Sequence, residues 1–381
     1  MGFLRFILAV SVIIAHASPI AGLRFVGGSI AVETFFMISG FYMALILTEK
    51  YVGKGRYQAF LQSRLLRLFP AYWVVAIFIV LISVLHSTFL EGGLVLQSWM
   101  QNWNVLNIFS KIFLIFTNIF IVGQDWGTFL QVHQPDGYLT LALDYTKTEP
   151  QVHTFLLIPP AWSLSVELLF YMIAPLLVSR NLLTIVLMMF ASLILRLGLY
   201  SVGLDHDPWT YRFFPTELLF FLGGIISYRI YAKFKNHILD PGKLLLIMLF
   251  AQAFTLGYQF IPETVFKQWI YYAVLLVSLP FVFIYTKKSK FDRLLGELSY
   301  PIYIVHLFVV VLIGRIVYST ALKTVVQNRQ ELILENFSGI ITLFVSTLLA
   351  ILLIKLVMEP VEGYRQSIAK KLTQTKPASE L

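Results

Sequence analysis

Residues 69–88 read FPAYWVVAIFIVLISVLHST, a run without a single Lys, Arg, Asp or Glu. A helix of this length, rising about 1.5 Å per residue, is about 30 Å long and matches the hydrocarbon core of a bilayer. The run therefore predicts a transmembrane helix, and similar runs in the rest of the chain decide the fold.

The composition of the whole chain agrees with a membrane protein. Of its 381 residues, 58% are hydrophobic and 13% are charged, and the mean hydropathy is +0.78. A soluble domain carries about 25% charged residues because water must wet its surface. The chain has no Cys, which excludes disulfides, thiolate metal sites and a Cys nucleophile. We attribute the formal charge of +9 to loops that face anionic lipid, and not to a nucleic-acid site.

Eleven segments are long and apolar enough to be candidate membrane helices. They are 5–22, 29–48, 69–88, 105–123, 159–178, 182–201, 213–232, 243–261, 267–286, 296–316 and 337–357. Lys and Arg concentrate in cytoplasmic loops, which orients the set. If 105–123 crosses, the basic clusters at 229–243 and 287–293 fall outside; if it does not, they fall inside. The sequence therefore predicts an all-α polytopic bundle of about ten transmembrane helices, with cytoplasmic N- and C-termini and a re-entrant or interfacial segment near 105–123.

The domain organisation follows from these spans. Residues 1–364 are expected to form one membrane domain, and 365–381 a short, disordered cytoplasmic tail. The outer region 89–158 is long, and long insertions in compact proteins more often have a function than none. The first segment, with Ala15-His16-Ala17 after an apolar run, also matches a cleavable signal peptide. That alternative would remove His16, so it bears on the site.

Polar side chains at bilayer depth are costly unless paired, and they are the main functional signal. Arg5 and His16 are eleven residues apart, which puts them on one helix face about 16 Å apart along the axis. Glu33 enters the second span at a depth near His16 and could orient its imidazole. A structural His, an interfacial Arg and a helix-start Glu are the alternatives.

Two further pairs lie in the early spans. Ser39-Gly40 allows close approach of a ligand or, more simply, of another helix. Arg64 and Arg67 share a face at the inner surface, where two guanidinium groups suit phosphate, although a cluster flanking a span is the plainer explanation.

Later spans contribute a third group. Trp162 fits an interfacial aromatic belt. Glu167 has no cation near it in sequence, so it is expected to find a partner on another helix. Ser163, Tyr171, Tyr300 and His306 are packing or substrate-binding candidates. The spacing of the histidines matches no compact metal motif, so no metal site is predicted.

Taken together, these residues resemble the membrane acyltransferase-3 family. The matching stretches are Arg5 with His16, GGSIAVETFFMISGF at 27–41, RLLRLFPAYW at 64–73, WSLSVELLFY at 162–171 and LSYPIYIVH at 298–306. Each motif is short, but five in this order, over nearly the whole chain, are specific. The resemblance favours retention of the first helix. Glu33 stands where Asp is more common, and the extracytoplasmic hydrolase-like domain of many members is not found.

The resemblance implies acyl transfer from a cytoplasmic acyl-CoA, usually acetyl-CoA, to a hydroxyl of a cell-surface or lipid-linked glycan. The acyl-CoA would be a co-substrate, with no tightly bound cofactor, and the setting would be a bacterial inner membrane. Polysaccharide-assembly proteins and membrane lipid are the candidate partners besides the glycan. The implied site residues are His16 and Glu33 for catalysis, Arg5, Arg64, Arg67, Ser39 and Gly40 for the donor, and Trp162, Ser163, Glu167, Tyr171, Tyr300 and His306 for substrate or structure.

Two mechanisms remain open. His16 acts as a general base oriented by Glu33, or it carries the acyl group itself. Two other classes of function also fit ten spans with buried charges: a transporter or flippase of a lipid-linked sugar, and a non-catalytic assembly subunit. The absence of an inverted repeat and the clustering of motifs argue against the transporter.

Overall fold

The computed structural model describes residues 1–51, 56–89, 92–317 and 330–365. Its helices are α1 Gly2–His16, α2 Gly28–Glu49, α3 Arg56–Phe89, α4 Gln97–Asn102, α5 Ile108–Phe120, α6 Trp162–Val178, α7 Leu182–Ser201, α8 Phe214–Phe234, α9 Pro241–Leu256, α10 Lys267–Thr286, α11 Lys290–Val317 and α13 Gln330–Leu353, with a π-helical turn at Ile354–Met358. Two short antiparallel strands, β1 Leu130–Val132 and β2 Leu139–Leu141, pair in the outer region. Residues 366–381 of the predicted tail lie outside the described residues.

All eleven predicted segments fall on helices, which confirms a polytopic helical membrane protein. In the described part of the chain, seven helices are long and apolar enough to cross a bilayer: α2, α3, α6, α7, α10, α11 and α13. Three more, α1, α5 and α9, are apolar but shorter. The count of about ten crossings and the side on which the termini lie stay predictions.

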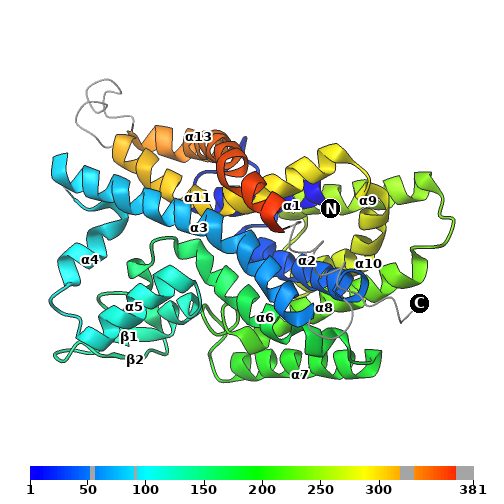
Figure 1. Ribbon diagram of the computed structural model, residues 1–381, viewed down its shortest axis with the longest axis horizontal. Coiled ribbons are helices and arrows are strands. Elements are labelled where there is room, and N and C mark those ends of the chain that lie inside the picture. The colour runs from blue at the N-terminus through cyan, green and yellow to red at the C-terminus, as the bar shows by residue number, and fades with distance from the viewer. Residues whose placement is uncertain (52–55, 90–91, 318–329, 366–381) are drawn as a thin grey trace.

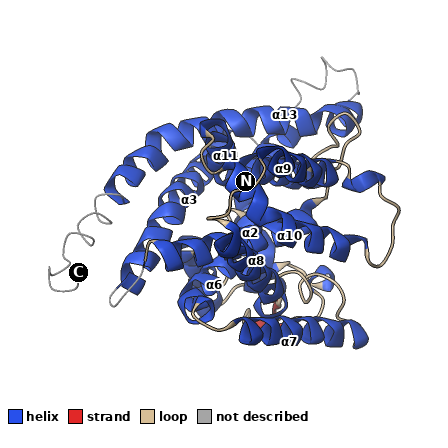
Figure 2. Cartoon of the chain, turned by 90° about the vertical axis from the view of Figure 1, so that its right-hand side faces the viewer, coloured by secondary structure: helices blue, strands red, loops and turns tan. Residues whose placement is uncertain are grey.

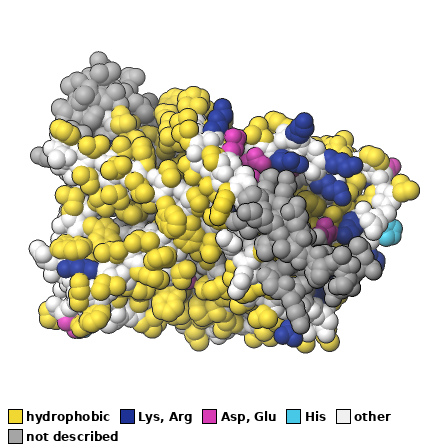
Figure 3. Space-filling view, in the orientation of Figure 1, with side chains coloured by type: hydrophobic (Ala, Val, Ile, Leu, Met, Phe, Trp, Pro, Cys, Tyr) yellow, Lys and Arg dark blue, Asp and Glu magenta, His cyan; other side chains and the backbone are white. Residues whose placement is uncertain are grey.

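The helices form a bundle with an apolar outer surface. In both ribbon views α13 lies at the upper edge and α7 at the lower edge, with α2 and α8 between them (Figures 1 and 2). Exposed side chains of α7 include Leu183, Leu187 and Ile194, as expected for a helix that faces lipid. On the face seen in Figure 3, hydrophobic side chains cover most of the surface and basic side chains gather toward the right-hand end.

Helix α1 is held inside the bundle by α11. The Asp292 carboxylate accepts hydrogen bonds from the backbone N–H groups of Gly2 (2.7 Å) and Phe3 (2.9 Å), which satisfies two of the free donors at a helix start. A Cβ on Gly2 would lie 1.5 Å from the Asp292 carbonyl oxygen, so only glycine permits this approach. A Cβ on Gly296 would likewise lie 3.0 Å from the Gly2 Cα. The starts of α1 and α11 are therefore in backbone contact.

Helices α2 and α8 make a second close contact. A Cβ on Gly40 would lie 2.1 Å from the Phe221 carbonyl oxygen, and a Cβ on Gly224 would lie 2.0 Å from that of Met37. Small residues at a helix interface let the backbones approach in this way. Gly40 was predicted to contact the donor. Its position meets the requirement of helix packing, which was the alternative given for it, and the contact with a donor stays a prediction.

The outer region docks on the bundle through hydrogen bonds. The Tyr72 hydroxyl of α3 donates to the Asn118 carbonyl oxygen at 2.7 Å. Ser165 of α6 donates to an Asp125 carboxylate oxygen at 2.7 Å and accepts from the Gly123 backbone N–H at 2.9 Å. Helix α5, which contains most of the predicted segment 105–123, has 13 residues. It is thus shorter than the about 20 residues a crossing needs, in line with a re-entrant or interfacial segment.

Replacing Gly40 by Ala is expected to lower the thermal unfolding midpoint in detergent. The added methyl group overlaps the α8 backbone, and overpacking of this kind costs about 1–3 kcal/mol. Gly198→Ala is the matched control, because nothing lies within 4 Å of a Cβ at this position in α7. The close α2–α8 contact would be refuted by a Gly40→Ala protein as stable as the Gly198→Ala protein.

Stability should also depend on the pH through Asp125. Burial raises the pKa of this carboxyl, outside the membrane-spanning helices, to about 6, against about 3.9 in an unfolded chain. Between these values the unfolded state releases the proton and the folded state keeps it, so stability falls as the pH rises. We expect the unfolding midpoint of the wild type to drop from pH 4 to pH 7 more than that of Asp125→Asn. Parallel curves would contradict the assignment.

Candidate active site

A cavity of about 350 Å³ lies inside the bundle. Its walls come from α1, α2, α3, α6, α10 and α11, and from the turn between α10 and α11. Of the residues predicted from sequence, it brings together Arg5, Ser39, Arg64, Arg67, Ser163, Glu167, Tyr171 and Tyr300. These positions span some 300 residues of chain, so the folded bundle gathers the sequence motifs into one site.

One end of the cavity is basic and open. Its basic side chains are those of Arg5, Arg64, Arg67, Lys287 and Arg293. Lys287 and Arg293 are exposed, whereas Arg64 is 7% exposed. The Arg64 Nε has no hydrogen-bond partner among the described residues. An orphaned guanidinium donor at a basic cavity mouth is suited to an anionic group, above all a phosphate.

Glu167 forms the centre of the cavity wall. Its Oε1 accepts hydrogen bonds from Ser39 of α2 and from Tyr171 of α6, both at 2.5 Å. The expectation that Glu167 finds a partner on another helix is thereby confirmed. Tyr300 is also held in place, because its hydroxyl donates to the Leu68 carbonyl oxygen of α3 at 2.7 Å. The middle of the cavity therefore has one carboxylate that accepts from two hydroxyl groups, with the Tyr300 hydroxyl held separately by α3.

The other end of the cavity carries two hydroxyl groups. The hydroxyl oxygens of Ser163 and Tyr303 lie 2.8 Å apart. Each also lies within hydrogen-bonding distance of the Pro160 carbonyl oxygen, at 3.0 and 3.1 Å. The Tyr303 ring also lies 5.8 Å, centroid to centroid, from the ring of His306. Tyr303 was not among the predicted site residues. Its spacing of three from both Tyr300 and His306 on one helix face was the signal that could have found it.

The two histidines meet beyond this end. His16 is the last residue of α1 and is exposed, while His306 of α11 is fully buried. Their ring centroids are 5.4 Å apart. Neither ring lines the cavity itself, but Tyr303 connects the cavity wall to His306. The single helix α1 thus carries Arg5 at the basic end and His16 at the far end, a rise of about 16 Å.

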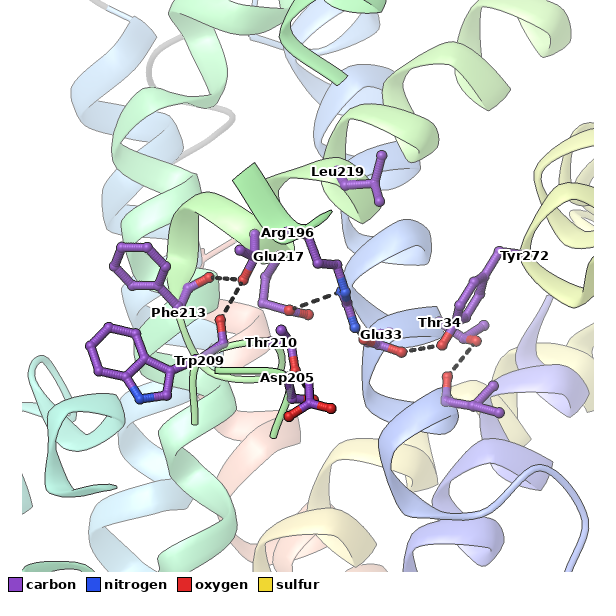
Figure 4. Close-up of polar contacts among 12 residues, drawn as sticks. Glu33, Thr34, Arg196, Asp205, Trp209, Thr210, Phe213, Glu217, Leu219 and Tyr272 are labelled. Carbon is purple, nitrogen blue, oxygen red and sulfur yellow. Dashed lines mark hydrogen bonds and ion pairs between the residues drawn. The ribbon is translucent and has the colours of Figure 1, made fainter. Parts of the chain in front are cut away.

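The structure corrects the pairing predicted for Glu33. Its carboxylate binds the Arg196 guanidinium at 2.7 Å and accepts a hydrogen bond from the Tyr272 hydroxyl (Figure 4). Arg196 also bridges to Glu217, at 3.3 Å. No hydrogen bond or ion pair within the described ranges joins Glu33 to His16. Glu33 points toward α7, α8 and α10 because an unpaired carboxylate in the bundle interior would be costly, and the buried guanidinium of Arg196 lies there.

Trp162 lies outside the cavity. It is 5% exposed, packs against Tyr211 with ring centroids 4.8 Å apart, and has the Arg212 guanidinium 4.5 Å from its ring. Asp207 pairs with this guanidinium at 2.7 and 2.9 Å. Trp162 therefore has a clear structural role at the start of α6.

Among the described residues no cluster of three or more His, Asp and Glu is arranged to hold a metal ion.

Comparison with known proteins assigns the family. A family model described as an acyltransferase domain, acyltransferase-3, matches residues 1–356. The chain belongs to the acyltransferase-3 family. No curated protein and no solved structure matches it.

Membership in the acyltransferase-3 family makes the chain an integral membrane acyltransferase. The match covers the residues that line the cavity and both histidines. It favours an enzyme over the transporter that ten spans would also allow.

Proposed function

We propose that this acyltransferase transfers an acyl group, most simply acetyl, from acyl-CoA to a hydroxyl of a cell-surface or lipid-linked glycan. The cavity carries this proposal: it is basic and open at one end, and it carries the Ser163 and Tyr303 hydroxyl groups at the other, beyond which the two histidines meet. A bacterial cytoplasmic membrane, with the basic end on the cytoplasmic side, is the proposed setting.

The donor fits the cavity by charge and by length. The phosphates of CoA are anionic, and the open end presents the five basic side chains, with a free donor on Arg64. The pantetheine arm is extended and largely apolar, and the wall above the basic end includes Val32, Phe35 and Phe36. With its phosphates held beside Arg5, such an arm reaches the far end of α1, about 16 Å away.

The chemistry is assigned to His16. As a general base, its imidazole takes the proton of the acceptor hydroxyl while the oxygen attacks the thioester carbon. The acyl carbon–sulfur bond then breaks, and the proton passes to the departing thiolate to give free CoA. The second route, in which His16 first takes the acyl group and then gives it to the acceptor, also balances. His16 is exposed, so an acceptor reaches it without entering the cavity.

Removing the basic groups should weaken donor binding. Arg64→Gln and Arg67→Ala are each expected to raise the KM for acetyl-CoA tenfold or more, because a charge-assisted hydrogen bond is worth about 1.5–3 kcal/mol. Lys243→Ala is the control, since Lys243 is exposed and does not line the cavity. Binding can be measured on purified protein in nanodiscs. A protein that ignores acetyl-CoA would support a transporter.

His16→Ala should abolish transfer while leaving the protein in the membrane with its affinity for acetyl-CoA intact. A general base contributes about 10²–10⁴-fold to the rate. Mass spectrometry of surface glycans from cells with wild-type, His16→Ala or no protein measures the effect and identifies the acyl group by its mass. Unchanged acylation in the His16→Ala strain would remove His16 from the mechanism.

A further inference from the structure

His306 has a defined tautomer. Its Nδ1 lies 2.7 Å from the backbone carbonyl oxygen of Tyr303. A carbonyl oxygen only accepts hydrogen bonds, so Nδ1 carries the proton, and in a neutral imidazole Nε2 then carries a lone pair. The ring is fully buried and makes no ion pair within the described chain, so a charged imidazolium would have no counter-ion there.

The Nε2 of His306 is an unmet acceptor. It is buried and has no hydrogen-bond partner among the described residues. Leaving such an atom unsatisfied costs about 1–3 kcal/mol. The neighbouring polar ring is that of His16, with centroids 5.4 Å apart and planes inclined by 37°. His16 is exposed at the end of its helix, so its ring can turn to bring an N–H toward His306.

We propose that His306 is a positioning residue that fixes the tautomer of His16. The Nε2 of His306 accepts a hydrogen bond from one ring N–H of His16, and the other His16 nitrogen keeps its lone pair for the acceptor hydroxyl. This inference rests on the proposed function of His16 as a base. It gives to His306 the orienting role that the sequence suggested for Glu33, whose carboxylate is engaged by Arg196 and Tyr272.

The proton balance of the reaction is kept. The free His16 nitrogen takes the proton from the acceptor hydroxyl, and the new oxygen–carbon bond forms as the carbon–sulfur bond breaks. The proton then leaves His16 for the thiolate. His306 gains and loses nothing: it holds its own proton at Nδ1 and accepts one hydrogen bond throughout.

A neutral acceptor suits this position better than a carboxylate. A carboxylate in place of His306 would be a buried charge without a cation, and burying it would cost several kcal/mol. The Tyr303 carbonyl oxygen binds Nδ1 of His306 and so fixes the ring, while Nε2 stays available for His16. A metal-ligating imidazole is fixed in the same way, by a partner on the nitrogen that does not bind the metal. Tyr303 also lines the cavity, so the same backbone segment positions the end of the donor site and the base.

Two substitutions at His306 separate positioning from packing. His306→Leu removes the acceptor, and we expect kcat to fall about 10–100-fold, the usual effect of losing an outer partner, with an unchanged KM for acetyl-CoA. His306→Gln offers an amide oxygen where Nε2 was and should recover most of the lost rate. The control is His86→Leu: His86 of α3 makes the same Nδ1-to-carbonyl contact, to Gly92 at 2.8 Å, away from the site. Equal kcat in wild type and His306→Leu would overturn the proposal.

A measurement on the wild-type protein covers the case in which His306→Leu does not fold. Nitrogen-15 NMR of histidine-labelled protein in lipid should show a coupling between one nitrogen of His16 and Nε2 of His306 across an N–H···N bond, with assignments from His16→Ala. A protonated Nε2 on His306, or a His16 present as an uncoupled mixture of tautomers, would overturn the proposal. If instead His16→Ala stays active, the proposed function itself fails; if His16→Ala is inactive while both His306 variants keep full kcat, only this inference fails.

Discussion

The cost of burying charge is the constraint on which this structure depends. Arg196 is 5% exposed, and it lies between the carboxyl groups of Glu33 and Glu217, so its buried charge is stable only beside them. Arg64 is nearly as buried, but it makes no ion pair with another described residue, and its Nε, like that of Arg196, has no hydrogen-bond partner there. The first cluster holds α2, α7 and α8 in place. Arg64 has no such carboxylate partner in the described part of the chain, and it lines the cavity.

The site is organised along one helix. α1 carries a cation at its first turn and an imidazole at its last residue, so the separation of the two ends is set by helix rise and not by loops. Asp292 fixes where this helix starts, through the backbone of Gly2 and Phe3. The distance between the basic end of the site and the imidazole of His16 is therefore fixed by this one helix.

Sequence reasoning succeeded where the bilayer alone dictates the answer. Segments 182–201 and 267–286 were predicted with the bounds that the structure has, because apolar length and flanking charge decide them. It did not find the direction of Glu33, which depends on how α2 packs against α7, α8 and α10. The meeting of His16 with His306, 290 positions apart in the chain, depends on how α1 packs along α11, and no local pattern contains that.

The glycine contacts have a mechanical consequence. α2 and α8 touch backbone to backbone at Gly40 and Gly224, and α1 and α11 do so at Gly2 and Gly296. Close-packed pairs of this kind do not stretch; they shift as units. The cavity is walled by α1, α2 and α11, which belong to both pairs. The cavity then widens or narrows by movement of one pair against the other, and not by movement of a loop.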